Sequence, residues 1–317
     1  FLPDYLVHDP MTDVAIIIVN WNGKDLLRRC LNAVRETVQA VSYETYVVDN
    51  HSSDGSQEVV RNEYPWVKLI ANTENLGFAK ANNQAMRLAL EHSRYVLLLN
   101  SDAFVKPRCI DQMVAFMDQH PEAGLGAPKL LYEDGRLQRS CYTFPTLWTE
   151  LWIALGIDKF MSRSRLFGDY NLTHWNYDTV REVDVIMGAF MLARREAVQQ
   201  VGLMDEAFFM YSEEVDWCYR FAAAGWKTLF TPEVECIHLW GGSSQQVKVE
   251  SLIRLYKARV QFARKHYSRL TTLAYKGVIA LNALVRIIPG APFYLRSAHG
   301  RQKHYAFRRL LTAVPGF

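Results

Sequence analysis

Three short polar clusters stand at points where buried-type hydrophobic runs end. They are Asn20-Trp21-Asn22, Asp49 and Asn100-Ser101-Asp102. If these runs are neighbouring strands of a parallel sheet, their carboxyl ends meet at one crevice, where such sheets bind ligands. Asn and Asp are also common turn residues, so each cluster alone is equally well explained as a cap. The three clusters together favour a ligand site.

Phosphate binding at this crevice would have to do without a glycine-rich loop. The first hydrophobic run is not followed by G-x-G-x-x-G, and G-x-x-x-x-G-K-[ST] does not occur in the chain. A divalent metal, Mg²⁺ or Mn²⁺, could neutralise phosphates instead, because one carboxylate plus substrate phosphates commonly holds Mg²⁺. Asp102 is the candidate carboxylate, and His238, shortly before Gly241-Gly242, is a second candidate ligand. A lone histidine near an apolar strand is more often structural, so both explanations of His238 stay open.

An acidic cluster, Glu213-Glu214-Val215-Asp216, opens an expected helix. Acidic side chains in a first helical turn complement the helix dipole, and the spacing alone favours this explanation. The catalytic alternative is that neighbouring carboxylates repel one another, which raises one pKa and suits a general base.

The elements that would position these residues alternate regularly in the first hundred residues. The β-branched run 14–19 is typical of a strand buried on both faces. Further strands are expected at 45–49, 67–71 and 95–99, with helices at 24–39, from the loop 50–56 to about 64, and at 76–91. This alternation predicts an α/β fold with a doubly wound, mostly parallel sheet and helices on both faces.

The second half is less regular. Helices are expected at 108–119 and 213–224, and strands at 125–132, at 183–193 with an interruption at Gly188, and at 234–239. Between them, residues 140–180 are rich in aromatic residues, including Trp148, Trp152 and Trp175. These rings could line an acceptor site, although packing of a small lid or a subunit contact is the preferred explanation.

Charge is distributed unevenly over the 317 residues, whose net charge is +3. Residues 251–317 hold 13 of the 36 Lys and Arg residues and no Asp or Glu, so residues 1–250 carry a net charge of −10. Helices are expected at 250–266 and 272–287 of this basic tail. The positive charge of this tail predicts a contact with an anionic membrane surface. Nucleic acid is a poorer partner, because no nucleic-acid-binding motif accompanies the charge. A solvated helical hairpin or a homodimer contact is the alternative.

Other features bear on the compartment. Five cysteines without C-x-x-C spacing favour a reducing environment. Residues 1–12 have neither a basic segment nor a long apolar run, so we expect no signal peptide. No run reaches about 18 uncharged apolar residues, so we expect no transmembrane helix. We therefore expect a cytoplasmic protein, peripheral on the inner face of the cell membrane.

The motifs in their order resemble the family 2 inverting glycosyltransferases of GT-A fold, and most closely the bacterial rhamnosyltransferase-like subgroup. The resemblance covers about residues 13–245. The matching segments are 19–23, 48–56, 75–83, 98–102, 187–190, 194–196, 201–206, 209–216 and 238–243. It implies an N-terminal extension (1–12), a nucleotide-sugar half (13–106), an acceptor half (107–245) and a helical basic region (246–317).

The resemblance also implies roles for matching residues. Asp49 would read a uracil or thymine base, and Asp102 would close a D-x-D motif and bind the metal with His238. Glu214 occupies the position of the usual catalytic Asp, with Glu213 and Asp216 as further candidates. The nucleotide-sugar set would comprise Asn20, Trp21, Asn22, Asp49, Asn50, Ser52, Gly77, Phe78, Ala79, Asn83, Asn100, Ser101 and Gly188.

The implied activity is inverting transfer of a single sugar, since the Q-x-x-R-W signature of processive synthases is absent. The subgroup implies dTDP-rhamnose as donor and a saccharide or lipid-linked saccharide of surface polysaccharide biosynthesis as acceptor. Two positions depart from the family pattern: Asn100 replaces one carboxylate of D-x-D, and Glu214 replaces Asp. A non-catalytic sugar-nucleotide or glycan-binding module and a transferase with a UDP-hexose donor are therefore alternatives. A sugar nucleotidyltransferase is disfavoured, because no Gly-rich, Arg-containing loop follows the first strand.

Overall fold

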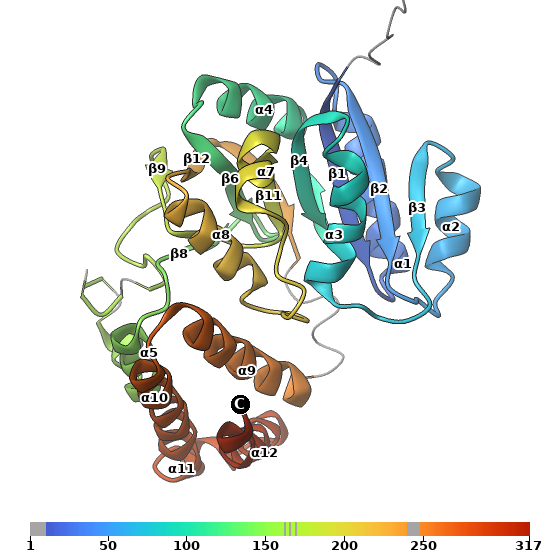
Figure 1. Ribbon diagram of the computed structural model, residues 1–317. Helices are drawn as coiled ribbons and strands as arrows, with labels where there is room; N and C mark the ends of the chain where they lie inside the picture. Colours follow the sequence, from blue (N-terminus) through green and yellow to red (C-terminus); the bar gives the residue numbers. More distant parts are fainter. Residues whose placement is uncertain (1–10, 162, 165, 169, 240–247) are drawn as a thin grey trace, which may run out of the picture.

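The computed structural model describes residues 11–161, 163–164, 166–168, 170–239 and 248–317. Most of the N-terminal extension, the segment 240–243 of the last family motif and the boundary expected at 245–246 lie outside these residues. The main sheet runs in the order β3-β2-β1-β4-β11-β6-β12-β5 (Figure 1).

The first half of this sheet is parallel, as expected. It comprises β1 (Thr12–Asn20), β2 (Tyr43–Asp49), β3 (Val67–Ala71) and β4 (Ser93–Asn100). The connections are α1 (Lys24–Thr37), α2 (Ser56–Glu63) and α3 (Phe78–Ala89). The register pairs Asn20 with Asp49 and Val19 with Asn100, so the polar clusters end their strands side by side.

The second half is mixed. The strand β11 (Phe190–Arg194) runs antiparallel between β4 and β6 (Ala123–Leu131), β12 (Lys227–His238) is parallel to β6, and β5 (Ala103–Val105) pairs antiparallel with β12. Its helices are α4 (Cys109–Gln119), α7 (Arg195–Val201) and α8 (Glu213–Ala223). The short strands β7 (Leu137–Gln138) and β9 (Arg181–Glu182) extend the sheet, while β8 (Cys141–Tyr142) pairs with β10 (Val185–Ile186).

Two hydrophobic clusters cover the two faces of the sheet, which confirms the doubly wound arrangement. Alternate residues of β1 enter them: Ile17 faces α3, whereas Ile16 and Ile18 face α1 and α4. All five cysteines are buried free thiols.

The C-terminal region is helical and has its own hydrophobic core. It comprises α9 (Lys248–His266), α10 (Arg269–Ile287), α11 (Ala291–Tyr294), α12 (Ala298–Ala313) and a final 3₁₀ turn (Val314–Gly316). Tyr256, Val260, Tyr275, Ile279 and Leu310 are among its core residues. The helix α5 (Leu147–Leu155), which is followed by α6 (Ile157–Phe160), packs on α10, so residues 147–160 join this helical body (Figure 1).

Three expectations change. The strand expected at 183–193 is two pieces, β10 and β11, and the last strand begins at Lys227 rather than 234. Trp175 is a core residue stacked on Tyr177, while Trp148 is exposed and stacks on Trp152. The helix α10 is long and apolar enough to cross a membrane by length and composition alone, although we expected no such segment.

Candidate active site

A buried polar cluster joins the ends of β1 and β2. Asn20 and Asp49 are 0% and 1% exposed, and Asn20 Nδ2 donates to Asp49 Oδ2 at 3.0 Å. The other carboxylate oxygen, Oδ1, accepts from the Ser52 amide at 2.9 Å and from Gln57 Nε2 at 2.8 Å. These bonds fix the orientation of a carboxylate that burial alone would disfavour. Gln57, which the sequence analysis did not single out, belongs to this cluster.

The loop after β1 is held against the loop after β2. Asn22 adopts a left-handed φ of 49°, its amide donates to Ser52 Oγ at 2.9 Å, and its Oδ1 accepts from the Ser53 amide at 2.8 Å. Trp21 beside it is half-buried. A hollow of about 310 Å³ opens between Asn22 and Asp54, at the start of α1. Of the residues expected to line a crevice at this strand end, the hollow contacts Asn22.

Gly77 marks a close approach between the two halves. Its φ is 79°, and a Cβ at this position would lie 2.2 Å from the Phe209 carbonyl oxygen. The next amide, of Phe78, donates to that oxygen at 2.8 Å, and Asn50 Nδ2 donates to the Gly77 carbonyl at 3.0 Å. The Phe78 ring lies beside Gly188, where a Cβ would be 3.5 Å away. Only glycine fits the approach at residue 77.

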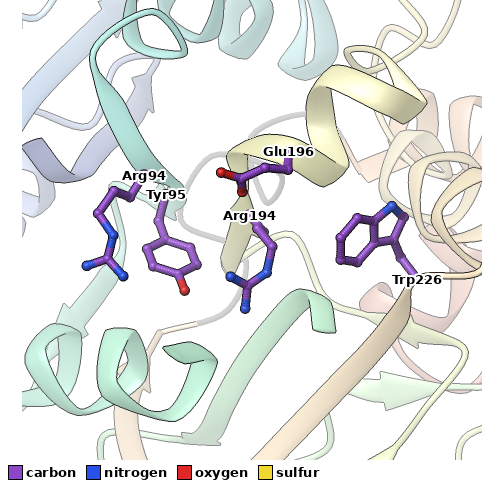
Figure 2. Close-up of a pocket in the computed structure, with 5 residues that line it drawn as sticks. All are labelled: Arg94, Tyr95, Arg194, Glu196 and Trp226. Carbon is purple, nitrogen blue, oxygen red and sulfur yellow. The ribbon is translucent and has the colours of Figure 1, made fainter. Parts of the chain in front are cut away.

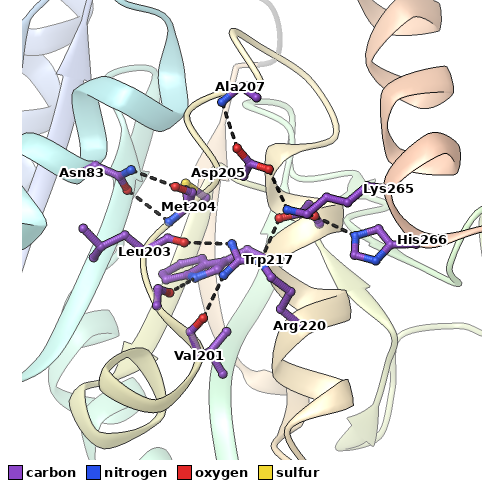
Figure 3. A network of polar contacts seen from close by, with 12 residues as sticks. Asn83, Val201, Leu203, Met204, Asp205, Ala207, Trp217, Arg220, Lys265 and His266 are labelled. Atoms are coloured by element: carbon purple, nitrogen blue, oxygen red, sulfur yellow. Dashed lines mark hydrogen bonds and ion pairs between the residues drawn. The ribbon is translucent and has the colours of Figure 1, made fainter.

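Asn83 and Ala79 have packing partners. The Asn83 amide donates to the Met204 carbonyl at 2.8 Å, and its Oδ1 accepts from the Met204 amide at 3.1 Å (Figure 3). Ala79 is fully buried in the core. Asn83 therefore holds Met204, in the segment that leads to α8, by two hydrogen bonds.

Asp102 and His238 lie together across two elements. His238 Nε2 is 3.2 Å from Asp102 Oδ1, and both residues are buried. The other ring nitrogen, Nδ1, faces Gln138 Oε1 at 2.7 Å, so Nδ1–H donates to that oxygen and Nε2 is turned towards the carboxylate. The backbone amide of Asn100 donates to the Ala189 carbonyl at 3.0 Å. Ser101, next to Asp102 in the chain, is buried.

A carboxylate and an imidazole oriented by an amide form a donor set suited to Mg²⁺ or Mn²⁺. Among the described residues, no group of three or more His, Cys, Asp and Glu side chains could hold a metal ion. The pair would therefore supply part of a coordination shell, with substrate oxygens supplying the rest.

Glu213 and Glu214 start α8 after two strained residues. Tyr211 and Ser212 have φ of 71° and 64°, an arrangement that costs energy and is common at functional sites. Glu213 Oε2 is buried without a hydrogen-bond partner. Burial, then the charge of Glu214, raises the pKa of Glu213 well above its usual range. Burial also raises the pKa of Glu214, which two backbone amides and the guanidinium of Arg259 oppose.

Asp216, the third acidic candidate, is engaged in ion pairs. Its fully buried carboxylate receives Arg220 Nε at 2.8 Å, Lys265 Nζ at 2.8 Å and His266 Nε2 at 2.7 Å (Figure 3). The same Lys265 ammonium lies 2.6 Å from Asp205. Asp216 thus fastens α8 to α9 and to the 205–212 loop.

Besides Gln57, four residues of this site were not found from the sequence. Gln138 lies on the short strand β7, and Arg259, Lys265 and His266 lie on α9. Arg259 is held by Glu150 of α5 at 2.7 and 2.8 Å and stacks over Tyr170. Arg259 and Lys265 were counted with the basic charge of the tail, and nothing in local spacing indicates that they turn inwards.

A second hollow, of about 280 Å³, lies at the other end of β4, beside Tyr95 (Figure 2). Its two arginines are occupied: Arg94 pairs with Asp13 and Asp118, and Arg194 donates to the carbonyls of Met117, His120 and Ala123. It shares no residue with the crevice at the carboxyl ends.

Comparisons with known proteins agree with this geometry. Residues 10–260 match the family described as glycosyltransferase like family 2. The chain is 28% identical over 269 residues to an N-acetylglucosaminyl-diphospho-decaprenol L-rhamnosyltransferase of Mycobacterium tuberculosis, covering 81% of this chain and 86% of the relative. It is 26% identical over 236 residues to the rhamnosyltransferase WbbL of Escherichia coli, covering 71% and 83%.

A solved structure shows the same fold at low identity. A mannosyltransferase from Pyrobaculum calidifontis, solved with GDP-Man and Mn²⁺, superposes with a TM-score of 0.54 at 18% identity, covering 97% of this chain and 89% of the other. The fold is thus the GT-A fold, with a helical C-terminal region added. The chain belongs to the family described as glycosyltransferase like family 2.

Proposed function

We propose that this protein transfers a single sugar, with inversion, from a nucleoside-diphosphate sugar to a hydroxyl of a saccharide carried on a lipid diphosphate, and that the donor is dTDP-rhamnose. The observation that carries the proposal is the pair Glu213–Glu214 at the start of α8, both raised in pKa, which follows a segment that contacts Gly77 and Phe78 through Phe209. The names of the mycobacterial and enterobacterial relatives support rhamnose as the sugar, and the former supports a lipid-linked acceptor.

The cluster at Asp49 suits the base of the donor. An ionised carboxylate has about four acceptor positions. Three are used by Asn20, Ser52 and Gln57. The remaining position would accept the imide N–H of thymine or uracil. The rival donor, a UDP-hexose, offers the same N–H, so the Asp49 contact selects the pyrimidine class rather than the sugar.

Asp102 and His238 would hold Mg²⁺ or Mn²⁺. The fit rests on their 3.2 Å separation and on Gln138, whose Oε1 accepts a hydrogen bond from Nδ1–H, so that Nε2 would be the ligand atom. When bound, the ion would neutralise the diphosphate of the donor and its developing charge. The loss of one carboxylate at Asn100 would make metal binding depend more strongly on the nucleotide.

We assign the general base to Glu214. The charge of Arg259 favours the ionised form of Glu214, whereas Glu213 is buried with an unpartnered oxygen beside a like charge. In a coupled carboxylate pair, the better-stabilised member ionises first and its neighbour keeps the proton. Glu214 would then take the proton of the acceptor hydroxyl as that oxygen attacks the anomeric carbon, while the bond from this carbon to the diphosphate oxygen breaks and the nucleoside diphosphate leaves.

The experiment is a two-stage test on the full chain. Calorimetry with dTDP, UDP and GDP, with and without Mn²⁺, should show metal-dependent binding of dTDP or UDP and weaker binding of GDP. Incubation with dTDP-rhamnose and an N-acetylglucosaminyl-diphospho-lipid should then yield a product of inverted anomeric configuration by NMR.

Glu214→Gln is expected to lower kcat by about 10²–10⁴-fold while dTDP binding persists. The matched control is Glu58→Gln, an exposed acid of α2. Nucleotide binding without transfer to any acceptor would favour the non-catalytic binding module. Absence of binding by any nucleotide would overturn the proposal.

A further inference from the structure

The helix α10 exposes a continuous apolar stripe. Leu270, Leu273, Leu281, Leu284 and Ile288 follow the spacing of one helical face, with Gly277 between them. Leu270, Leu273 and Ile288 are 78%, 66% and 67% exposed. An exposed face of a helix in water is normally polar, so this stripe calls for a partner.

The opposite face of α10 is already packed. Tyr275, Ile279 and Ala283 are buried in the helical core with α9 and α12. The helix is therefore apolar on both sides, yet only 28% of its most apolar stretch is buried. The folded chain buries one face of α10 and leaves the other face exposed.

The region that carries the stripe is rich in positive charge. Residues 251–317 contain 13 Lys and Arg residues and no acidic residue. The exposed Arg269 and Arg296 flank the two ends, and the apolar surface continues through Phe293, which is 74% exposed. Exposed cations on α12 are Arg301, Lys303, Arg308 and Arg309.

We infer that the α10 face, defined as Leu270, Leu273, Leu281, Leu284, Ile288 and Phe293, docks in the interfacial layer of an anionic lipid bilayer. Apolar side chains entering the acyl boundary, with basic side chains at the head groups, form the pattern of an interfacial helix. A second copy of this chain is a poor occupant, because two surfaces without acidic residues would repel each other across the contact.

The helix lies on the membrane rather than across it. Arg286 donates to the carbonyls of Ile153 and Ala154 in α5, and Asn282 Nδ2 donates to the Tyr256 hydroxyl in α9. Insertion across the bilayer would break these bonds and expose the buried core face to lipid. The inference does not depend on the proposed donor, because it concerns a surface outside the nucleotide crevice.

Docking would also orient the catalytic half. The same α9 that packs on α10 carries Arg259 and Lys265, which reach Glu150 and Asp216. The lipid surface and the carboxylates of α8 are therefore linked through one helix. An acceptor carried on a lipid would be presented on the side where this helical region lies.

The test is vesicle flotation of the full chain. Vesicles of phosphatidylcholine with one third phosphatidylglycerol should bind the protein at least about tenfold more strongly than phosphatidylcholine alone, and added salt should weaken the binding. Leu270→Gln with Leu273→Gln should lower the partition coefficient by about tenfold or more. The matched control, Leu88→Gln with Leu166→Gln, changes two exposed leucines elsewhere and should leave it unchanged.

Three results would overturn the inference. The first is equal flotation of the α10 variant and the control. The second is binding that resists a high-salt and alkaline wash, which would indicate a spanning helix. The third is a dimer in sedimentation analysis that the α10 variant abolishes. Retained dTDP binding and an unchanged Tm in the variant exclude misfolding, and keep this result separate from the fate of the proposed activity.

Discussion

Lys265 of α9 places its ammonium 2.8 Å from the fully buried carboxylate of Asp216 on α8. Through the same ammonium it reaches Asp205 at 2.6 Å, in the segment that leads to the strained turn at Tyr211 and Ser212. The start of α8, with Glu213 and Glu214, is thus clamped from the C-terminal region. Lys265 lies beyond residue 260, where the family match ends.

Lys265→Met is expected to loosen this clamp. The substitution leaves part of a buried charge unpaired, so unfolding free energy should fall by about 1–3 kcal/mol. If the clamp positions the base, kcat should fall more than KM changes, and Lys265→Arg should restore much of it. Denaturant unfolding and steady-state kinetics measure the two effects. Lys257→Met, an exposed lysine of the same helix, is the control and should stay within about 0.5 kcal/mol of wild type. A loss of stability with unchanged kcat would show that the clamp is structural only.

Glu213→Gln should stabilise the protein at neutral pH. Because the folded-state pKa of Glu213 is raised, the stability it contributes is present below the unfolded pKa and is lost as pH rises towards the folded pKa. An amide does not ionise, so the gain should be about 1–3 kcal/mol at neutral pH and vanish below the unfolded pKa. Urea unfolding at several pH values measures it, against Glu58→Gln.

The same substitution separates the two glutamates in catalysis. Gln resembles protonated Glu, so Glu213→Gln should retain kcat within about tenfold, whereas Glu214→Gln should not. The reverse order would move the base assignment to Glu213.

The acid side of the pH–rate profile should depend on Arg259. With Glu214 as the proposed base, activity requires its ionised form and should be lost as pH falls through the raised pKa of that group. Removing the positive charge of Arg259 raises this pKa further, and the loss should begin at higher pH. The double variant Glu150→Gln with Arg259→Gln removes both charges of this ion pair, so that neither partner is left unpaired. Arg259→Lys keeps the charge, so its profile should follow wild type; an identical shift in both variants would contradict the assignment.

Gly77→Ala should disturb the close contact of residues 77 and 78 with Phe209. Its Cβ would meet the Phe209 carbonyl, so the loop must move, at a cost of about 1–3 kcal/mol beyond the strain of the positive φ. Gly135→Ala is the matched control, since Gly135 has a φ of 82° and open space around it. That variant should lose only about 1 kcal/mol. Thermal unfolding and dTDP calorimetry compare the two, and equal effects would show that the approach to Phe209 is not limiting.

The first half of the fold was predictable because its signals are local. The run 14–19 became β1 (Thr12–Asn20), and the helix expected at 24–39 became α1 (Lys24–Thr37). The antiparallel insertion of β11 between β4 and β6 was not predictable, because it depends on pairing between residues far apart in the sequence. The start of β12 was missed because an irregularity between Thr231 and Glu235 interrupts its pattern.

The residues of the site also divide into those with a local sequence signal and those without one. Asn20 and Asp49 could be proposed because each ends a recognisable strand, and the sheet register then pairs them. Asp102 could be proposed because it follows the end of β4 by two residues. Gln138 and Arg259 could not, because each belongs to an element whose place is set by tertiary packing. A basic residue in a basic tail carries no local sign that it points inwards.

The seam at Gly77 and Asn83 also limits how far the two halves can be exchanged. Beside Gly77 the Phe78 amide donates to the Phe209 carbonyl, and Asn83 bonds main-chain atoms of Met204, so residues 77–83 hold the segment that leads to the proposed base. A chimaera that takes residues 12–106 from a relative with another donor would keep this segment seated only with glycine at 77 and an amide at 83. Donor preference in this chain can therefore be transplanted only together with the residues that join its halves.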